Sequence, residues 1–388
     1  MKKIVSLVLV AVMVMAMGTA FTGCSSSKKD EGDDFKVGVI LVGDENEGYT
    51  YAHMLGIKAM QKELGLSDDQ IVWKYNIPEG DECLEAAEDL AADGCNIIFA
   101  NSFNHEDYIL QAAEEYPDVQ FCHATGYQAA SSGLDNMHNY FTAVYESRYV
   151  SGVVAGLKLN EMVANGEITE DDALIGYVGA FPYAEVISGY TSFYLGVLSV
   201  ADYATMEVKY TSSWADQELE QQTAQALIAD GCVLISQHAD TTGAPTACEA
   251  AGVPCVGYNI SMLEAAPSVA LTSASIDWSA YYTYAVESTM NGEDFDVDWC
   301  KGYSEGADKI TELGTACAEG TAEKVAEVEA AIKDGSLHVF DTSTFTVEGQ
   351  SLEEYAPDDA NVSDGYYHES ESASAPSFAY IIDGITEK

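Results

Sequence analysis

Basic residues are scarce in this chain: 16 Lys and Arg stand against 64 Asp and Glu, and Arg148 is the single arginine. Nucleic acids and other polyanions are bound through clustered Lys and Arg, and one residue cannot form an arginine cluster for phosphate. The formal net charge of -48 therefore excludes a nucleic-acid partner and argues against a phosphorylated ligand. With 47% hydrophobic residues the chain can still build packed cores, which excludes global disorder.

Motifs of the common enzyme classes are missing as well. The chain contains no GxSxG, GxxxxGK[ST] or HExxH pattern, and its seven histidines are scattered. Residues 294–305 imitate the acidic spacing of a calcium loop, but Trp299 occupies the position that requires glycine, and the alternating apolar residues there favour a strand. We therefore expect no enzymatic activity, no cofactor and no metal site.

The nine cysteines include no CxxC pair, which argues against a zinc knuckle and a thioredoxin-type redox centre. An exported chain permits disulfides, yet several of these cysteines fall on strand and helix faces with a core pattern. We therefore expect mostly free, buried thiols among the eight that follow Cys24.

The N-terminal residues have the pattern of an export signal. Lys2 and Lys3 precede an apolar run over residues 4–20, which predicts a signal peptide at 1–23. Residues 21–24 (FTGC) resemble a bacterial lipobox with Cys24 as the lipidated residue; ordinary cleavage near Ala20 is the alternative. Residues 24–35 are polar and predict a flexible tether. We thus expect a bacterial protein, exported and held by its lipid anchor alone on the outer face of the cytoplasmic membrane or the periplasmic side.

Two similar series of strands and helices follow the tether. Strand-like runs begin near positions 37, 71, 96 and 119, and again near 174, 206, 232 and 254, with helical patterns between them. The start-to-start spacings are 34, 25 and 23 residues in the first series and 32, 26 and 22 in the second. The ending LAADGC (90–95) is matched by LIADGC (227–232). These patterns predict an α/β protein with two doubly wound parallel-sheet lobes joined by a hinge.

The chain length of 388 residues suits more than one domain, and the two series set the boundaries. We predict that the first lobe comprises residues 36–145 together with approximately 263–335, and that the second comprises 146–262. A helix at 145–164 joins them, and Gly152 and Gly156 are spaced to let another element pack closely on it. Residues 336–388 are rich in Asp and Glu, and we predict that they form an acidic C-terminal extension packed on the body.

Ligands of open parallel sheets bind beyond the carboxyl ends of the strands, so the loops at those ends give the candidate site. These loops are rich in aromatic residues, Tyr183 and Tyr258 among them, and carry a few acids and amides. This composition suits a flat ligand, uncharged or cationic, held by stacking and directed hydrogen bonds. The candidate ligand-binding residues are Asp44, Tyr49, Asn101, Phe103, Tyr127, Phe181, Trp214, His238, Asp240 and Asn259.

The same residue types have structural alternatives, which the sequence leaves open. A carboxylate just ahead of a helical pattern can be its N-cap, an aromatic can seal a lobe, and an amide can fix its own turn. The first applies to Asp44 and Asp216, the second to Tyr49 and Trp214, and the third to Asn101 and Asn259. His238 can be a capped loop residue, and Arg148 can simply pair with a carboxylate at the hinge.

Several stretches of the chain resemble the basic membrane protein (BMP, PnrA-like) family of lipoproteins, the substrate-binding components of ABC importers. They include residues 43–56 (GDENEGYTYAHMLG), 175–197, 212–243 (SSWAD…QHADTTG) and 256–262 (VGYNISM). The resemblance covers most of residues 36–300. It implies a type I periplasmic-binding-protein fold, ABC permease subunits as partners, and a monomer.

The resemblance is strongest in the SSWAD, QHAD and GYN segments, which are similar to the subgroup that handles purine bases or nucleosides. It implies that Tyr49 and Trp214 hold the base and that Asp240 and Asn259 lie in matching polar loops. Tyr49 stands where relatives often carry Trp or Phe, and no clear ribose-binding pattern is present, so base and nucleoside both remain open. A sugar or another small molecule on the same fold is the alternative, because aromatic stacking serves sugars equally well.

Overall fold

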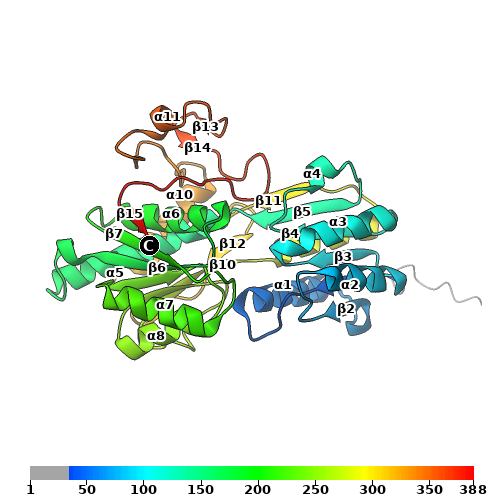
Figure 1. Ribbon diagram of the computed structural model, residues 1–388, viewed down its shortest axis with the longest axis horizontal. Coiled ribbons are helices and arrows are strands. Elements are labelled where there is room, and N and C mark those ends of the chain that lie inside the picture. The colour runs from blue at the N-terminus through cyan, green and yellow to red at the C-terminus, as the bar shows by residue number, and fades with distance from the viewer. Residues whose placement is uncertain (1–34) are drawn as a thin grey trace, which may run out of the picture. The chain divides into compact units, whose positions relative to one another are not determined.

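Two parallel β-sheets organise the computed structural model, which describes residues 35–388 (Figure 1). The predicted signal peptide 1–23, Cys24 and all but the last residue of the predicted tether 24–35 lie outside the described residues. Residues 35–388 form one compact unit. Among them, no helix combines the length and apolar character that a membrane span requires.

The first sheet has six parallel strands in the order β11-β5-β4-β3-β1-β2. Helices α1 and α9 pack together and share one apolar core, while α2 and α3 contribute to another, so both faces of this sheet are covered. The strands are β1 (Val37–Ile40), β2 (Ile71–Lys74), β3 (Ile97–Ala100), β4 (Gln120–Ala124), β5 (Met137–Thr142) and β11 (Asp298–Lys301); the helices are α1 (Gly48–Leu64), α2 (Asp81–Ala92), α3 (Glu106–Glu115), α4 (Ala129–Ser132) and α9 (Ser279–Asn291).

The second sheet has seven strands in the order β12-β10-β9-β8-β6-β7-β15, with β12 antiparallel to β10. Helices α5, α6 and α10 share one core, and α7 and α8 share another. The strands are β6 (Leu174–Gly179), β7 (Thr205–Tyr210), β8 (Leu234–Gln237), β9 (Cys255–Tyr258), β10 (Ala270–Ile276), β12 (Asp308–Ile310) and β15 (Ile385–Glu387); the helices are α5 (Val144–Ala164), α6 (Ala184–Leu198), α7 (Gln217–Ala229), α8 (Gly243–Ala251) and α10 (Thr321–Lys333).

The prediction of a two-lobed α/β fold with parallel sheets is confirmed. All eight predicted strands are present, and each begins within two residues of the predicted position. The repeated helix endings are also alike in three dimensions. Gly94 and Gly231 both have a positive φ, and in each case the following cysteine N–H donates to a leucine carbonyl five residues back, at 3.1 Å.

The predicted placement of residues 263–335 in the first lobe differs from the observed topology. From this segment only β11 joins the first sheet, and α9 packs on it through α1. Strands β10 and β12 belong to the second sheet, and α10 packs against α5. The sequence pattern of this segment could not show which sheet its strands would join, because strand pairing depends on contacts outside the segment.

Three connections therefore join the two sheets: one from β5 into α5, one from β10 into α9, and one from β11 to β12. Such multiple crossings define a hinge region between two lobes. Strand β11 also occupies the segment that imitated a calcium loop, and Trp299 on it is buried. Among the described residues, no group of three or more His, Cys, Asp or Glu side chains is placed to hold a metal ion.

Residues 336–388 pack on the second lobe through a cluster that contains Phe340, Phe345 and Phe378. This extension also contains α11 (Leu352–Tyr355), β13 (Val362–Ser363) and β14 (Tyr366–Tyr367), and it ends in β15, which pairs with β7. Burial of aromatic side chains attaches this acidic segment to the body.

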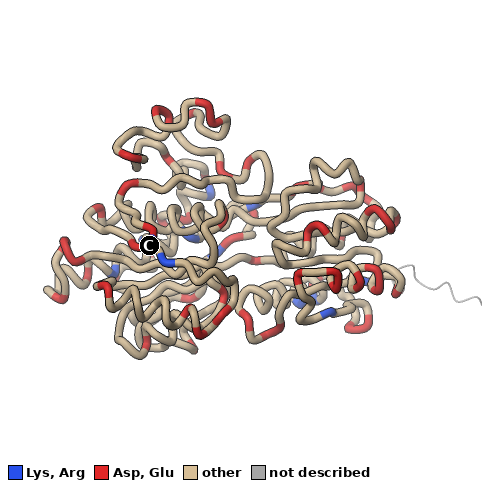
Figure 2. Tube along the Cα trace, viewed as in Figure 1, with Lys and Arg blue, Asp and Glu red and all other residues tan. Residues whose placement is uncertain are grey.

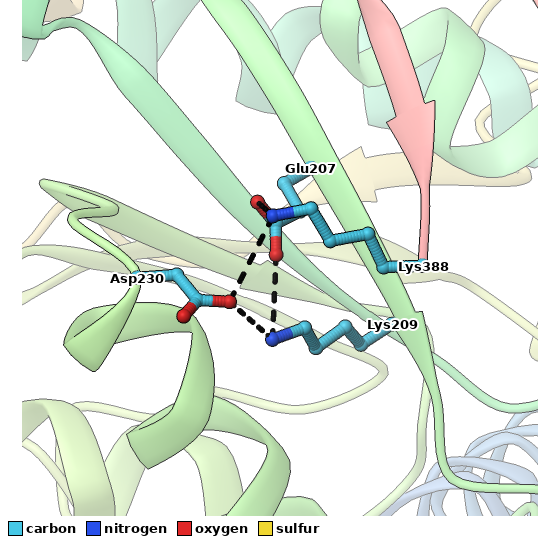
Figure 3. A network of polar contacts seen from close by, with 4 residues as sticks. All are labelled: Glu207, Lys209, Asp230 and Lys388. Carbon is cyan, nitrogen blue, oxygen red and sulfur yellow. Dashed lines mark hydrogen bonds and ion pairs between the residues drawn. The ribbon is translucent and has the colours of Figure 1, made fainter.

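A network of ion pairs reinforces that attachment (Figure 3). The buried carboxylate of Glu207 on β7 lies 2.5 Å from Lys388 Nζ and 3.3 Å from Lys209 Nζ, and Lys209 also pairs with Asp230 at 2.5 Å. Elsewhere acidic residues are spread over most elements, while basic residues are few (Figure 2). The network thus pairs the buried Glu207 carboxylate with two ammonium groups, those of Lys209 and Lys388.

The eight cysteines of the described residues are all free, six of them buried and two partly buried. Burial raises the pKa of several of these thiols, to about 12 for Cys83 and Cys122. These neutral, inaccessible thiols behave as small apolar core residues. The prediction of mostly free, buried cysteines is confirmed for this part of the chain.

Candidate functional site

A cavity of about 500 Å³ is lined by residues that follow strands of both sheets. The first lobe contributes the loops after β1, β2, β3 and β4, and the second contributes those after β6, β7 and β8 together with the end of β9. The carboxyl ends of both sheets therefore meet at one site, as expected for open parallel sheets. The lining residues are Val42, Gly43, Asp44, Glu47, Tyr49, Asn76, Glu79, Asn101, Ser102, Phe103, Thr125, Phe181, Glu185, Ser212, Ser213, Trp214, Ala215, His238, Asp240 and Tyr258.

Most of the predicted site residues line this cavity, and two do not. Those that do are Asp44, Tyr49, Asn101, Phe103, Phe181, Trp214, His238 and Asp240. Tyr127 is 60% exposed, and its ring lies 6.3 Å from that of Phe103. Asn259 is buried behind the cavity, where its Nδ2 donates to Asp240 Oδ1 at 2.7 Å. Asn259 therefore positions a lining carboxylate rather than lining the cavity itself.

Aromatic rings from two loops of the second lobe pack together at the cavity. Phe181 stacks on Tyr183 with centroids 5.1 Å apart and an interplanar angle of 10°, and it meets Trp214 edge-on at 5.2 Å. Trp214 also lies 6.2 Å from the ring of His238. These contacts support the rings from behind, and Phe181 and Trp214 line the cavity as stacking surfaces for a planar ligand.

Tyr49 of the first lobe is held in one orientation. Its hydroxyl donates to the carbonyl of Asn101 at 2.6 Å, and its ring lies edge-on to His53 and to Trp278. The Asn101 side chain is engaged too, since its Oδ1 accepts the Val42 N–H at 2.9 Å. The Asn101 amide therefore holds the loop after β1 rather than its own turn, and it also borders the cavity.

The Asp240 backbone joins the two lobes at the cavity wall. Its carbonyl accepts the Gly48 N–H at 3.0 Å, and its own N–H donates to the Trp214 carbonyl at 2.9 Å. A Cβ on Gly48 would come within 2.8 Å of that carbonyl oxygen, so only glycine allows the approach. Burial, reinforced by the charges of Glu47 and Glu220, raises the pKa of the Asp240 carboxyl well above its ordinary value. The shift favours the protonated form of this carboxyl, which can donate a hydrogen bond as well as accept one.

His238 and Arg148 form a buried pair at the back of the site. Burial, followed by the nearby Arg148 charge, lowers the pKa of His238 to about 4, so the imidazole is neutral at physiological pH. His238 Nε2 lies 3.3 Å from Glu185 Oε1. Arg148 donates to the Gln237 carbonyl at 2.7 Å, and its guanidinium carbon lies 3.6 Å from the centre of the Tyr258 ring. Arg148 makes no ion pair with a carboxylate of the described residues, so that alternative for it is wrong, and it instead supports Tyr258 from behind.

The N-cap alternative for Asp44 is also wrong. Glu47 caps α1, because its carboxylate accepts the N–H groups of Tyr49 and Thr50 at 2.8 and 2.9 Å. Asp44 instead accepts from Asn46, which lowers the pKa of its carboxyl. The same alternative holds for Asp216, which accepts the Leu219 N–H at 2.9 Å and caps α7.

Three further acidic residues, which the sequence analysis did not identify, line the cavity: Glu47, Glu79 and Glu185. A carboxylate directly before a helix was the available signal for Glu47. Glu79 and Glu185 gave no such signal, because their approach depends on how the strands align. No Lys or Arg lines the cavity in the described part of the chain. Its polar groups are carboxylates, hydroxyls, amides and a neutral imidazole.

Two parallel-sheet lobes, three connections and a ligand-sized cavity at the strand ends define a type I periplasmic-binding-protein fold. Solved structures agree on the fold. A solute-binding protein of an ABC transporter system from Conexibacter woesei superposes with a TM-score of 0.64 at 19% identity, covering 78% of this chain and 98% of that one. Another, from Aeropyrum pernix, gives a TM-score of 0.63 at 17% identity, covering 83% and 96%.

The family follows from the sequence. The profile of the PnrA-like ABC transporter substrate-binding proteins matches residues 10–329, and this chain belongs to that family. A purine-binding protein of Brucella abortus is 32% identical over 331 residues, covering 84% of this chain and 89% of its own length. A putative ABC transporter glucose-binding protein of Haloferax volcanii is 34% identical over 267 residues, covering 69% and 64%. The protein is thus an extracytoplasmic substrate-binding component of an ABC transporter, a family of binding proteins and not of enzymes.

Proposed function

We propose that this protein captures a purine nucleobase or nucleoside between its two lobes and delivers it to ABC permease subunits. The observation that carries the proposal is a cavity of about 500 Å³ that pairs aromatic rings with carboxylates and contains no Lys or Arg in the described chain. Phe181 and Trp214 offer faces for a planar ring, and the buried Asp240 can bond to ring N–H groups and nitrogens. The name of the Brucella abortus relative supports the same ligand class.

A sugar is the second candidate, because a relative from Haloferax volcanii is named as a putative glucose-binding protein. Carboxylates that accept from hydroxyl groups and an aromatic ring beneath the sugar face would serve that ligand. Purines are favoured here because the rings come in a cluster of Phe181, Tyr183 and Trp214. A fused planar base offers more stacking area to such a cluster than a puckered sugar does.

A thermal-shift panel on purified protein without residues 1–24 tests this assignment. A ligand that binds only the folded state at about 100 times its Kd adds about 2.7 kcal/mol of stability. We expect adenine, guanine, hypoxanthine or their nucleosides to raise the Tm by several degrees, with uridine and ribose as controls that leave it unchanged. A rise with glucose or galactose and none with any purine would show that the protein binds sugars instead.

We also propose that Cys24 is lipidated and anchors the protein to the membrane. The support is the sequence FTGC after an apolar run, followed by a polar tether; residues 1–34 lie outside the described residues. Metabolic labelling with palmitate should mark the wild-type protein, and Cys24→Ser should abolish the label. Persistent labelling of that variant would contradict the anchor without affecting the ligand assignment.

A further inference from the structure

Arg148 is buried at the start of α5 without a carboxylate partner among the described residues. Its Nη1 donates to the Gln237 carbonyl at 2.7 Å, while Nε and Nη2 have no acceptor in this part of the chain. A buried charge without a counter-ion costs folding free energy, and the side chain is only 1% exposed. A protein with 64 Asp and Glu has no shortage of counter-ions. The unpaired guanidinium therefore has a role other than stabilising the fold.

One side of helix α6 places Glu185 and Gly189 against the His238 ring. The two helix residues are four positions apart, so they lie on the same side of α6. Glu185 Oε1 lies 3.3 Å from His238 Nε2. A Cβ on Gly189 would lie 2.8 Å from His238 Nδ1 and 3.6 Å from Arg148 Nε, so both side chains pack against the glycine. The imidazole thus has a carboxylate at one nitrogen and the guanidinium on the side of the other.

These neighbours fix which nitrogen of His238 carries the hydrogen. A neutral imidazole has one donor and one acceptor nitrogen. Nε2 faces a carboxylate oxygen, whereas Nδ1 has no partner in the described residues and lies near a guanidinium, which offers no acceptor. Nε2–H is therefore the donor to Glu185. Because burial and then the Arg148 charge lower the pKa of His238 to about 4, the ring makes this bond as a neutral group.

Glu185 connects this arrangement to the ligand cavity. Its side chain is 16% exposed and lines the interlobe cavity. After burial, its negative charge is a further cause of the raised pKa of Tyr49 in the first lobe and of Asp240 in the second, so it lies near lining groups of both lobes. Within the described residues no side chain donates to its other oxygen, Oε2. That oxygen is free to accept a hydrogen bond from a ligand.

We propose that Glu185 accepts a hydrogen bond from a donor group of the ligand, and that His238 and Arg148 position it for this contact. The His238 Nε2–H holds one carboxylate oxygen and leaves the other for the ligand. Arg148 opposes protonation of the ring, and an imidazolium would pair with the carboxylate and weaken it as an acceptor. The inference rests on the proposed function, since it assigns a contact within the same cavity. For a purine the donor is a ring N–H or an amino group.

Calorimetric titrations with adenine, guanine and hypoxanthine, which all carry N–H groups, test the role of Glu185. Glu185→Gln keeps the size of the side chain but removes the charged acceptor, so the Kd of the bases that bind the wild type should rise roughly tenfold or more. The matched control is Glu218→Gln, at the same second position of α7, where the carboxylate is exposed and does not line the cavity. Its Kd should equal that of the wild type. An unchanged Kd in Glu185→Gln would overturn the assignment.

A double variant tests whether His238 acts through Glu185. His238→Leu removes the donor and should raise the Kd, whereas His238→Gln keeps a donor near the position of Nε2 and should recover most of the affinity. The double variant Glu185→Gln/His238→Leu should bind no more weakly than Glu185→Gln alone, because the two residues act as one unit. Additive losses would show that His238 contacts the ligand by itself, which would overturn its positioning role.

An NMR titration of the His238 imidazole in the ligand-free protein tests Arg148. The charged and titratable groups that face this ring are Arg148 from α5, Glu185 from α6 and Tyr258 from β9. Arg148→Met keeps the aliphatic stem and removes the charge, so the pKa of His238 should rise from about 4 by roughly one pH unit. Arg148→Gln removes the charge as well and serves if the methionine variant does not fold. Arg148→Lys keeps the charge and should titrate as the wild type does. An unchanged pKa in the uncharged variants would contradict the role of Arg148.

The outcomes separate this inference from the proposed function. If a purine binds the wild type and Glu185→Gln equally well, the purine assignment stands and the inference fails. If glucose binds and no purine does, the purine assignment fails, and titrating the same variants with glucose decides whether Glu185 accepts from its hydroxyl groups. The NMR titration decides the role of Arg148 in either case.

Discussion

Trp214→Ala should weaken binding of the cognate purine while leaving the protein folded. Stacking of a base on an aromatic side chain contributes about 1–3 kcal/mol, which corresponds to a roughly 5- to 150-fold rise in Kd. The Trp214 ring is only partly buried and borders the cavity, so the free energy of unfolding should fall by less than about 2 kcal/mol. Calorimetric titration and urea unfolding on the same preparation measure both quantities.

Two further variants make the Trp214 experiment specific. Trp214→Phe retains a stacking ring and should recover most of the lost affinity. Trp73→Ala removes a partly buried tryptophan that stacks on Tyr75 in the first lobe and does not line the cavity, so its affinity should equal that of the wild type. If Trp214→Ala loses several kcal/mol of stability and retains its affinity, the ring seals the lobe and does not hold the ligand.

Gly152→Ala should destabilise the protein by about 3 kcal/mol or more. In an unobstructed helix interior the same change stabilises by about 1 kcal/mol, because alanine loses less backbone entropy. Here a Cβ at position 152 would overlap the backbone carbonyl of Phe193 on α6, and a Cβ on Gly196 would overlap the carbonyl of Tyr149 in return. Helices α5 and α6 therefore meet backbone to backbone, and neither can yield without parting the core between them.

Urea or guanidinium unfolding followed by circular dichroism measures the effect of Gly152→Ala. The matched control is Ala164→Ser, which also adds one heavy atom to α5 but at an exposed position, and it should stay within about 0.5 kcal/mol of the wild type. An increase in stability for Gly152→Ala would mean that α5 and α6 lie further apart than described. Because α5 begins at a connection between the sheets, ligand affinity of the variant, where it folds, reports whether this packing also sets the cleft.

Local pattern was sufficient for the elements and for much of the candidate site. Buried parallel strands are continuous apolar runs, and their ends are marked by helix caps such as Gly94 and Gly231, so eight strands could be placed within two residues. The rule that ligands bind beyond the carboxyl ends of strands then selected loops, and most of the residues chosen from them line one cavity. Gly152 was also recognised from sequence as a point of close packing, since a small residue on a helix face leaves room for a neighbour.

The hydrophobic pattern of the sequence could not predict which strands pair with each other. Strand β10 (Ala270–Ile276) joins the second sheet, whereas β11 (Asp298–Lys301) joins the first. Only 21 residues lie between the two strands in the sequence. The same limit applies to side chains. Asn259 was expected in the cavity and instead lies behind Asp240. Glu79 and Glu185 line the cavity although the sequence did not indicate them.

By itself the sequence determined the class of this protein. Its acidity and single arginine argue against polyanionic ligands, its two matched series predict two parallel-sheet lobes, and its strand-end loops carry the aromatic residues of the cleft. Only the tertiary structure decided which sheets β10, β11 and β15 join and the burial of Arg148 against the Tyr258 ring. The physical reason is the distance along the sequence over which each interaction acts. Periodicity and caps act over a few residues, whereas strand partners and buried charges are selected by contacts with other segments, which for β11 with β5 and β15 with β7 lie more than a hundred residues away.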